Sequence, residues 1–172
     1  AMVEDEATPI ICNGFKDDKF IEAVILAAKI GKHIVPVVEK FSELKLIIRF
    51  AREHNVSPSI GIRVKLAARG AGRWEQSGGV RSKFGLFVSE VLDAVEVLRE
   101  NDMLDCLNLL HFHLGSQINN IRNVKSALIE LARVYVELSK AGAGLRYLDV
   151  GGGLGVDYDG SKTNVDSSMN YT

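Results

Sequence analysis

The sequence predicts an α/β fold with a parallel sheet, and two patterns support this prediction. Short apolar segments rich in β-branched residues alternate with longer segments whose apolar residues recur at helical spacing. Strands that alternate with helices pair in parallel through right-handed crossovers. Five predicted strands fit either an open doubly wound sheet or part of a (β/α)8 barrel.

The predicted strands are short and are bounded by turn-forming residues. Pro36 lies inside the second of them and removes one hydrogen-bond donor, which is unusual for an interior strand. The apolar residues on both sides of Pro36 still favour a strand there. The five strands are expected at residues 9–14, 33–39, 59–66, 107–113 and 145–150.

The predicted helices begin and end at residues with known capping preferences. Asp17 is the expected N-cap of the first helix, and Gly31 lies just past its end. Ser42 is expected to cap the second helix, which Asn55 ends. Residues 67–85 form a long insertion rich in glycine and basic residues, and loops of that length are usually functional or mobile. The remaining helices are expected at residues 88–99 and 124–140.

The composition indicates a single globular unit and excludes several classes of partner. The 172 residues are 47% hydrophobic and 25% charged, and 21 basic and 22 acidic side chains give a net charge of -1. This balance predicts neither a nucleic-acid surface nor a membrane patch. Cys12 and Cys106 have no metal or redox spacing, so we interpret both as buried thiols in a reducing compartment. Because the chain lacks an initiator methionine and ends in a polar tail, we expect a fragment of a longer protein.

Three consecutive glycines follow the fifth predicted strand. Without a Cβ, Gly151, Gly152 and Gly153 can turn backbone N–H groups toward an anion and let a ligand approach closely. The spacing fits neither a dinucleotide-binding fingerprint nor a P-loop. The run therefore predicts a phosphate site, with a glycine-rich strand exit that binds nothing as the alternative.

Polar residues gather where the predicted strands end. In both candidate architectures, ligands bind at the carboxyl edge of the sheet, so this arrangement favours a site there. The residues that end the five strands, in chain order, are Asn13, Glu39, Arg63, His111 with His113, and Asp149.

Several of these residues allow more than one interpretation. His111 and His113 share one face of a strand, which suits either a ligand site, a metal hydrolase with further ligands, or two inert core histidines. Ser116 either donates to the same phosphate as the glycines or caps a helix. Arg63 points inward and holds a carboxylate of a ligand or forms a structural ion pair. The lysines expected to be solvated are Lys16, Lys40 and Lys83.

Four motifs follow one another along the chain: ICNGFKD (11–17), SGGVRSKFGL (77–86), LLHFHLGSQI (109–118) and LDVGGGLGVDYDGS (148–161). In this order they resemble the biosynthetic arginine decarboxylases of bacteria and plants. The resemblance extends from residue 9 to residue 162 and leaves a polar tail at 163–172. The third and fourth motifs also resemble those of diaminopimelate decarboxylases, whereas the first two favour the arginine enzymes.

The resemblance implies an alanine-racemase-like (β/α)8 barrel that binds pyridoxal 5′-phosphate (PLP). It implies decarboxylation of L-arginine to agmatine and carbon dioxide for the synthesis of the polyamines putrescine and spermidine. Residues 1–172 would form a single incomplete barrel domain holding about strands 3 to 7. Five strands tilted by about 36° cannot close an eight-stranded ring, so we expect the isolated chain to be prone to aggregation.

The resemblance also implies roles for individual residues. His113 would stack on the pyridine ring, Ser116 and the three glycines would hold the phosphate, and Arg63 would lie beneath the cofactor. The family also uses Mg²⁺, for which this stretch shows no dedicated cage. The implied substrate-binding segment consists of Leu148, Asp149, Val150, Gly151, Gly152, Gly153, Leu154, Gly155, Val156, Asp157 and Tyr158.

The chain is not expected to contain the whole catalytic apparatus. In the resembled family, the lysine that holds PLP as a Schiff base lies on a strand that would precede Ala1, so no catalytic residue is assigned and the isolated chain should be inactive. The resemblance implies a homo-oligomer built from dimers, in the cytoplasm or in a plastid. Two alternatives remain: a diaminopimelate or other basic amino acid decarboxylase, and a PLP-binding homologue without catalysis.

Overall fold

The computed structural model describes residues 8–66 and 84–157 as alternating strands and helices. The predicted insertion therefore lies mostly outside the described residues, as do Lys83, Tyr158 and the polar tail. The elements are β1 (Ile10–Cys12), α1 (Asp18–Lys29), β2 (Ile34–Val38), α2 (Phe41–His54), β3 (Ile60–Arg63), α3 (Val88–Glu100), η2 (Leu104–Cys106), β4 (Leu107–His111), α4 (Ile121–Lys140) and β5 (Tyr147–Asp149).

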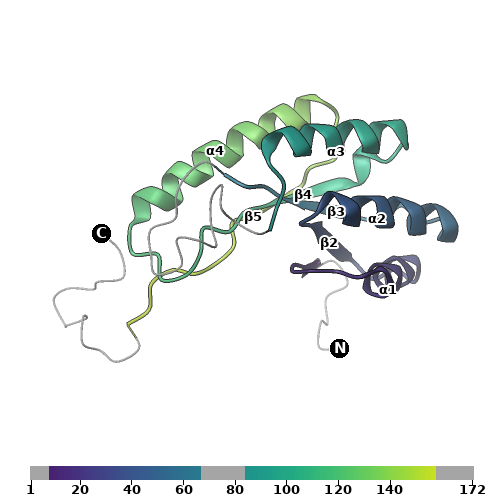
Figure 1. The fold of residues 1–172 in the computed structure, drawn as a ribbon, viewed down its shortest axis with the longest axis horizontal. Coiled ribbons are helices and arrows are strands. Elements are labelled where there is room, and N and C mark those ends of the chain that lie inside the picture. Colours follow the sequence, from purple (N-terminus) through teal and green to yellow (C-terminus); the bar gives the residue numbers. More distant parts are fainter. Residues whose placement is uncertain (1–7, 67–83, 158–172) are drawn as a thin grey trace.

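The strand order distinguishes between the two architectures that the sequence allowed. The five strands pair in parallel in the order β1-β2-β3-β4-β5, without the reversal of order that defines a doubly wound sheet. The helices follow one another around the outer side of the sheet (Figure 1). This order and the curl of the sheet confirm the predicted partial (β/α)8 barrel.

The curl brings residues of distant strands together across the inner face. His33, directly before β2, and Tyr147 of β5 have ring centroids 5.8 Å apart, although β3 and β4 separate their strands within the sheet. A flat sheet would place these rings about 14 Å apart, because neighbouring strands are spaced by about 4.8 Å. The described sheet is thus an arc whose concave side is the barrel interior.

The two faces of the arc carry different apolar layers. The outer face packs against the helices in one large core that includes Ile47, Ile62 and Leu110. The inner face holds a smaller cluster of Val35, Val37 and Leu109, with Ile11 and Tyr147 against it. Burial on both faces explains why the strands read as continuous apolar runs rather than as an alternating pattern.

Gly61 is required by the packing of this inner cluster. A Cβ at Gly61 would lie 2.9 Å from Leu109 Cδ2 and 3.1 Å from Val37 Cγ2. The two larger side chains therefore fill the space that the glycine leaves, as expected when interior barrel positions pack in layers.

A polar layer follows the apolar one toward the carboxyl edge. Arg63 is in register with His111, and His111 is in register with Asp149. Glu39 lies two residues beyond Val37, and Asn13 lies two residues beyond Ile11, so all five polar residues continue the inward-facing rows. The predicted gathering of polar residues at strand ends is therefore confirmed, because parallel register aligns them.

The first helix begins as predicted, but the second does not. Asp17 caps α1 by accepting the Phe20 N–H at 2.8 Å, and Gly31 has a φ of +85° just past its end. The N-cap of α2 is Lys40, so the prediction of Ser42 is wrong. The helix starts two residues earlier than predicted, with Glu43 as its third residue, and the Glu43 carboxylate accepts the N–H of the N-cap Lys40 as in a capping box.

Loss of the Asp17 cap is expected to destabilise the fold modestly. Asp17→Ala removes the oxygen that accepts the Phe20 N–H, and such losses cost about 1 kcal/mol. Denaturant unfolding should show this decrease, whereas Asp17→Asn, which keeps an acceptor oxygen, should remain close to wild type. Equal losses for both substitutions would contradict the assigned cap.

Candidate functional site

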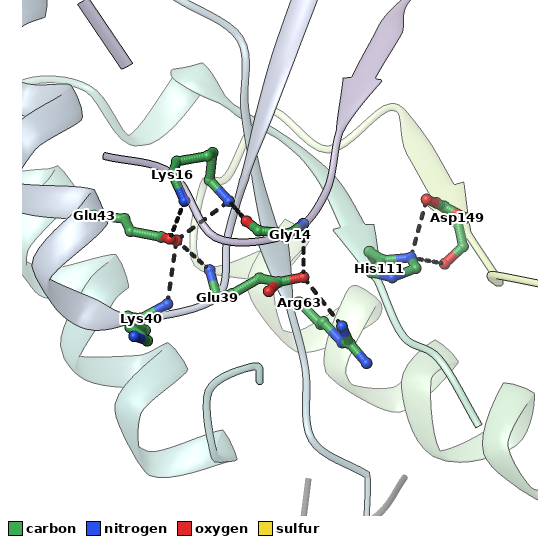
Figure 2. A network of polar contacts seen from close by, with 8 residues as sticks. All are labelled: Gly14, Lys16, Glu39, Lys40, Glu43, Arg63, His111 and Asp149. Carbon is green, nitrogen blue, oxygen red and sulfur yellow. Dashed lines mark hydrogen bonds and ion pairs between the residues drawn. The ribbon is translucent and has the colours of Figure 1, made fainter. Parts of the chain in front are cut away.

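Glu39 and Arg63 form an ion pair inside the polar layer. Arg63 Nη1 lies 3.0 Å from Glu39 Oε1, and the same oxygen accepts the Gly14 N–H at 3.2 Å (Figure 2). The Glu39 side chain is 1% exposed and that of Arg63 is 12% exposed. This is the structural ion pair that the sequence left as an alternative, and it fixes one edge of the guanidinium.

Within the described part of the chain, the pair leaves hydrogen-bonding capacity unused. Glu39 Oε2 is buried and has no hydrogen-bond partner among the described residues. Arg63 has five N–H donors, of which one is given to Glu39, and within residues 8–66 and 84–157 the others have no acceptor. Arg63 can therefore donate to a ligand while it stays paired with Glu39.

Lys16 is buried, so the prediction that it is solvated is wrong. It is 2% exposed and its Nζ lies 3.4 Å from Glu43 Oε2, while Nζ also donates to the Gly14 carbonyl. Glu43 further accepts the Glu39 N–H at 2.7 Å and the Lys16 N–H at 3.2 Å (Figure 2). This ion pair holds the segment after β1 against the start of α2, and that is why its lysine is not available to a ligand. By contrast, Lys40 is exposed as expected.

His111 and Asp149 form a second close contact of the polar layer. His111 is 4% exposed, and its Nδ1 lies 2.9 Å from Asp149 Oδ2. The other carboxylate oxygen, Oδ1, accepts the Gly151 N–H at 2.9 Å. The hydrogen bond from His111 is the main cause that lowers the pKa of Asp149, burial opposes it, and the Gly151 N–H and Asn13 lower the pKa further. Asp149 is therefore a carboxylate at neutral pH.

His113 lies beyond the end of β4 and is half-buried. Burial lowers its pKa below the ordinary 6.5, Arg63 and His111 lower it further, and Asp149 opposes them. Its imidazole is therefore neutral at pH 7. A Cβ placed on Gly151 would come within 3.0 Å of His113 Nδ1, so the glycine loop packs directly against this ring.

The glycine loop is held against the turn that follows His113. Ile118 donates its N–H to the Gly153 carbonyl at 2.9 Å, and Gly155 donates to the Ile118 carbonyl at 2.9 Å. Gly153 has a φ of +94°, and a Cβ there would lie 1.9 Å from the Gly115 carbonyl oxygen. These contacts place Ser116 beside the loop, because the same Cβ would lie 3.0 Å from Ser116 Cα.

Gly152 differs from its two neighbours because it faces open space. Among the residues that the structure describes, no atom lies within 4 Å of a Cβ built on Gly152, and its φ is not positive. In the described part of the chain, the N–H groups of Gly152 and Gly153 have no acceptor. Two free amides beside an opening that a side chain would fill suit a phosphate group, so these residues fit the anionic end of PLP.

The structure brings most of the predicted site residues together. His113, Ser116 and the three glycines lie on one edge, and Arg63 lies one layer deeper in the barrel.

Ser116 does not cap a helix, because Asn120 is the N-cap of α4, so that alternative is wrong. Cys106 is buried as predicted, but Cys12 is only partly buried. Of the predicted substrate segment, all but Tyr158 are described, and Val156 donates its N–H to Gln117 Oε1 at 2.9 Å.

The sequence placed Glu39 among the polar residues that end the strands but gave it no role of its own in the site. Its signal was its alternation with Val37, which places both side chains on the inner face of one strand. Lys16 and Glu43 left no such signal, since their ion pair depends on how the segment after β1 meets α2.

The structure assigns no residues to a metal ion. Among residues 8–66 and 84–157, no group of three or more histidine, cysteine, aspartate and glutamate side chains could hold one. Within the same residues, no helix combines the length and apolar character needed to cross a membrane.

Titration of His113 tests the electrostatics of the site. Because burial and Arg63 lower its pKa, we expect a midpoint below 6.5 when the histidine ring protons are followed by NMR. Arg63→Gln should raise the midpoint, whereas Asp149→Asn should lower it further, since the carboxylate opposes the other effects. A midpoint above 6.5 in the wild type, or shifts of the opposite sign, would contradict this arrangement.

The fold is a partial (β/α)8 barrel, and the glycine loop at its carboxyl edge suits a phosphorylated cofactor. The chain belongs to the family of pyridoxal-dependent decarboxylases, since the model of their pyridoxal-binding domain matches residues 3–171. This match confirms the wider family to which the resembled arginine decarboxylases belong, and with it PLP as the cofactor.

Individual relatives narrow the comparison to particular decarboxylases. The chain is 61% identical over 168 residues to a biosynthetic arginine decarboxylase of Rhodopirellula baltica, covering 98% of this chain and 25% of that protein. It is 38% identical to the solved biosynthetic arginine decarboxylase of Campylobacter jejuni, with a TM-score of 0.79, covering 96% of this chain and 26% of the other. The solved diaminopimelate decarboxylase of Helicobacter pylori is 29% identical to the chain, with a TM-score of 0.77. That match covers 91% of this chain and 38% of the other. The chain thus spans about a quarter of the length of the arginine decarboxylases it matches.

Proposed function

We propose that this chain is the cofactor-binding part of a longer PLP-dependent decarboxylase that converts L-arginine to agmatine and carbon dioxide. The observation that supports a PLP site here is the open position at Gly152. The N–H groups of Gly152 and Gly153, which have no acceptor among the described residues, lie beside it, and the neutral His113 ring is nearby. The choice of arginine rests on the 61% identity to an arginine decarboxylase over almost the whole chain. Agmatine would then supply polyamine synthesis.

In this proposal, each residue of the site holds a different part of the cofactor. The N–H groups of Gly152 and Gly153 donate to the phosphate, and Ser116 adds a hydroxyl donor beside them. His113 presents its ring to the pyridine, and its neutral state adds no positive charge near Arg63. Arg63 uses the donors that Glu39 leaves free to bind the cofactor from below.

Bound PLP supplies an electron sink that makes the loss of carbon dioxide from an amino acid possible. The residues described here bind and orient that group, and we assign none of them as the lysine that attaches it. Lys16 in particular is committed to Glu43 and the Gly14 carbonyl. The covalent attachment and the pyridine-nitrogen partner belong, in this proposal, to other parts of the longer protein.

The proposed activity is tested with the full-length protein that carries this chain. We expect release of labelled carbon dioxide from carboxyl-labelled L-arginine, loss of that release when PLP is removed, and recovery when PLP is added back. Parallel assays with meso-diaminopimelate and L-lysine should give little or no release.

The same assays distinguish the alternatives. Release from diaminopimelate without release from arginine would support the second decarboxylase class, whose solved Helicobacter pylori member shares the fold. PLP binding without release from any of the three substrates would support a homologue without catalysis. A protein that binds no PLP would overturn the proposal.

The assembly and location of the longer protein are part of the same proposal. We expect a homo-oligomer built from dimers in the cytoplasm, with the exposed edges of β1 and β5 covered by further strands of the barrel. Sedimentation of the full-length protein tests the oligomer: a monomer at micromolar concentration would contradict it.

A further inference from the structure

Asp149 contacts two separate segments of the candidate site at once. Its Oδ2 lies 2.9 Å from Nδ1 of His111, and its Oδ1 accepts the N–H of Gly151 at 2.9 Å. Its backbone carbonyl also accepts the Phe112 N–H at 3.1 Å. Asp149 therefore connects the strand that carries His111, a contact that Figure 2 shows, to the start of the glycine loop.

His111 fixes the position of the Asp149 carboxylate. The His111 ring is 4% exposed, and its Nδ1 also lies 3.2 Å from the Asp149 backbone carbonyl. A buried ring that contacts both the side chain and the backbone of one residue restricts that residue to a single rotamer. The second oxygen of the carboxylate is then directed to Gly151.

The contact at Gly151 determines where the next amide points. Gly151 has a φ of +69°, and a Cβ there would lie 2.7 Å from the Phe112 carbonyl oxygen. The backbone at the start of the loop therefore packs closely against Phe112. In the described part of the chain, the only acceptor for the Gly151 N–H is Asp149. Without it, this amide would be free to turn and the adjoining Gly152 amide with it, whereas the Gly153 carbonyl would stay bonded to the Ile118 N–H.

We propose that Asp149 is a positioning residue that sets the glycine loop for the phosphate of PLP and that His111 holds Asp149 in place. The inference rests on the proposed function, because it takes PLP as the ligand. Asp149 acts on the phosphate through Gly151 and does not itself contact the anion, which its own negative charge would repel. Its loss should therefore weaken binding of phosphorylated PLP more than binding of pyridoxal, which has the same ring without the phosphate.

The experiment compares PLP and pyridoxal as ligands of the full-length apoprotein that carries this chain. Dissociation constants are measured by equilibrium dialysis for the wild type, Asp149→Ala, His111→Leu and His111→Asn. Asp149→Ala should weaken PLP binding by about ten-fold or more, while pyridoxal binding should change by no more than about two-fold. His111→Leu should show a smaller loss for PLP, and His111→Asn, whose amide can donate to Oδ2, should recover most of it.

The outcomes separate this inference from the proposed function. If the wild type binds no PLP, the proposed function fails and the inference fails with it. If the wild type binds PLP but Asp149→Ala weakens PLP and pyridoxal equally, or weakens neither, only the positioning role is overturned. Should Asp149→Ala not fold, the comparison of His111→Leu with His111→Asn decides: equal PLP affinities in these two variants would overturn the role.

Discussion

Replacement of Gly152 by alanine is expected to weaken PLP binding by about five- to 150-fold, because a methyl group forced into an occupied space costs about 1–3 kcal/mol. The protein itself should fold normally. A Cβ placed on Gly152 has open space around it, and the residue has no positive φ, so alanine meets neither a clash nor backbone strain in the ligand-free chain. The methyl group would lie where we place the phosphate. The effect should therefore appear only on binding.

Spectroscopic titration with PLP checks this expectation, and two comparisons sharpen it. The melting temperature of the Gly152→Ala apoprotein should equal that of the wild type. Gly153→Ala provides the contrast, since its Cβ would meet the Gly115 carbonyl oxygen and its φ is +94°, so it should lower stability as well as affinity. Unchanged PLP affinity in Gly152→Ala would contradict the placement of the phosphate at the glycine loop.

Lys16→Ala should destabilise the protein by about 3–5 kcal/mol, because it leaves a buried carboxylate without its countercharge. The side chains of Lys16 and Glu43 are 1% and 2% exposed, so water cannot replace the lost ammonium without opening the structure. Glu43 cannot easily move away, since it also accepts backbone N–H groups of Glu39 and Lys40. The loss should therefore approach the full cost of an unpaired buried charge.

Denaturant unfolding of the full-length protein measures this loss, and Lys40→Ala is the matched control. Lys40 is exposed, and its Nζ lies 4.9 Å from the centroid of the exposed Phe15 ring, so its removal should cost no more than about 0.5–1 kcal/mol. Similar losses for Lys16→Ala and Lys40→Ala would contradict a structural role for the buried pair. A selective loss of activity in Lys16→Ala at unchanged stability would instead place Lys16 in the chemistry.

The order of elements could be predicted from the sequence because it depends on local patterns. Strand and helix segments follow from apolar periodicity, and Asp17 follows from the preference for an acidic N-cap. The ends of elements were less predictable. Ser42 has a side chain suited to an N-cap, but the helix begins at Phe41, before Ser42. Glu43 accepts the N–H of the N-cap Lys40, and this contact forms only once the first turn of the helix has folded.

The site was predictable where it depends on strand ends and not where it depends on long-range pairing. Parallel register brings Arg63, His111 and Asp149 into one layer, so their proximity follows from their positions at the ends of strands. The ion pair of Lys16 and Glu43 joins residues 27 positions apart on a loop and a helix, and each alone resembles a solvated surface charge. Their burial depends on the packing of the first two β/α units, which no local pattern specifies.

The central claim is that the N–H groups of Gly152 and Gly153 bind the phosphate of PLP at the carboxyl edge of the barrel. A crystal structure of the full-length protein with PLP tests it most directly. We expect phosphate oxygens within about 3 Å of both amide nitrogens, the distance of an N–H···O hydrogen bond, with the His113 ring against the pyridine. A phosphate bound elsewhere, with both amides facing solvent, would contradict it.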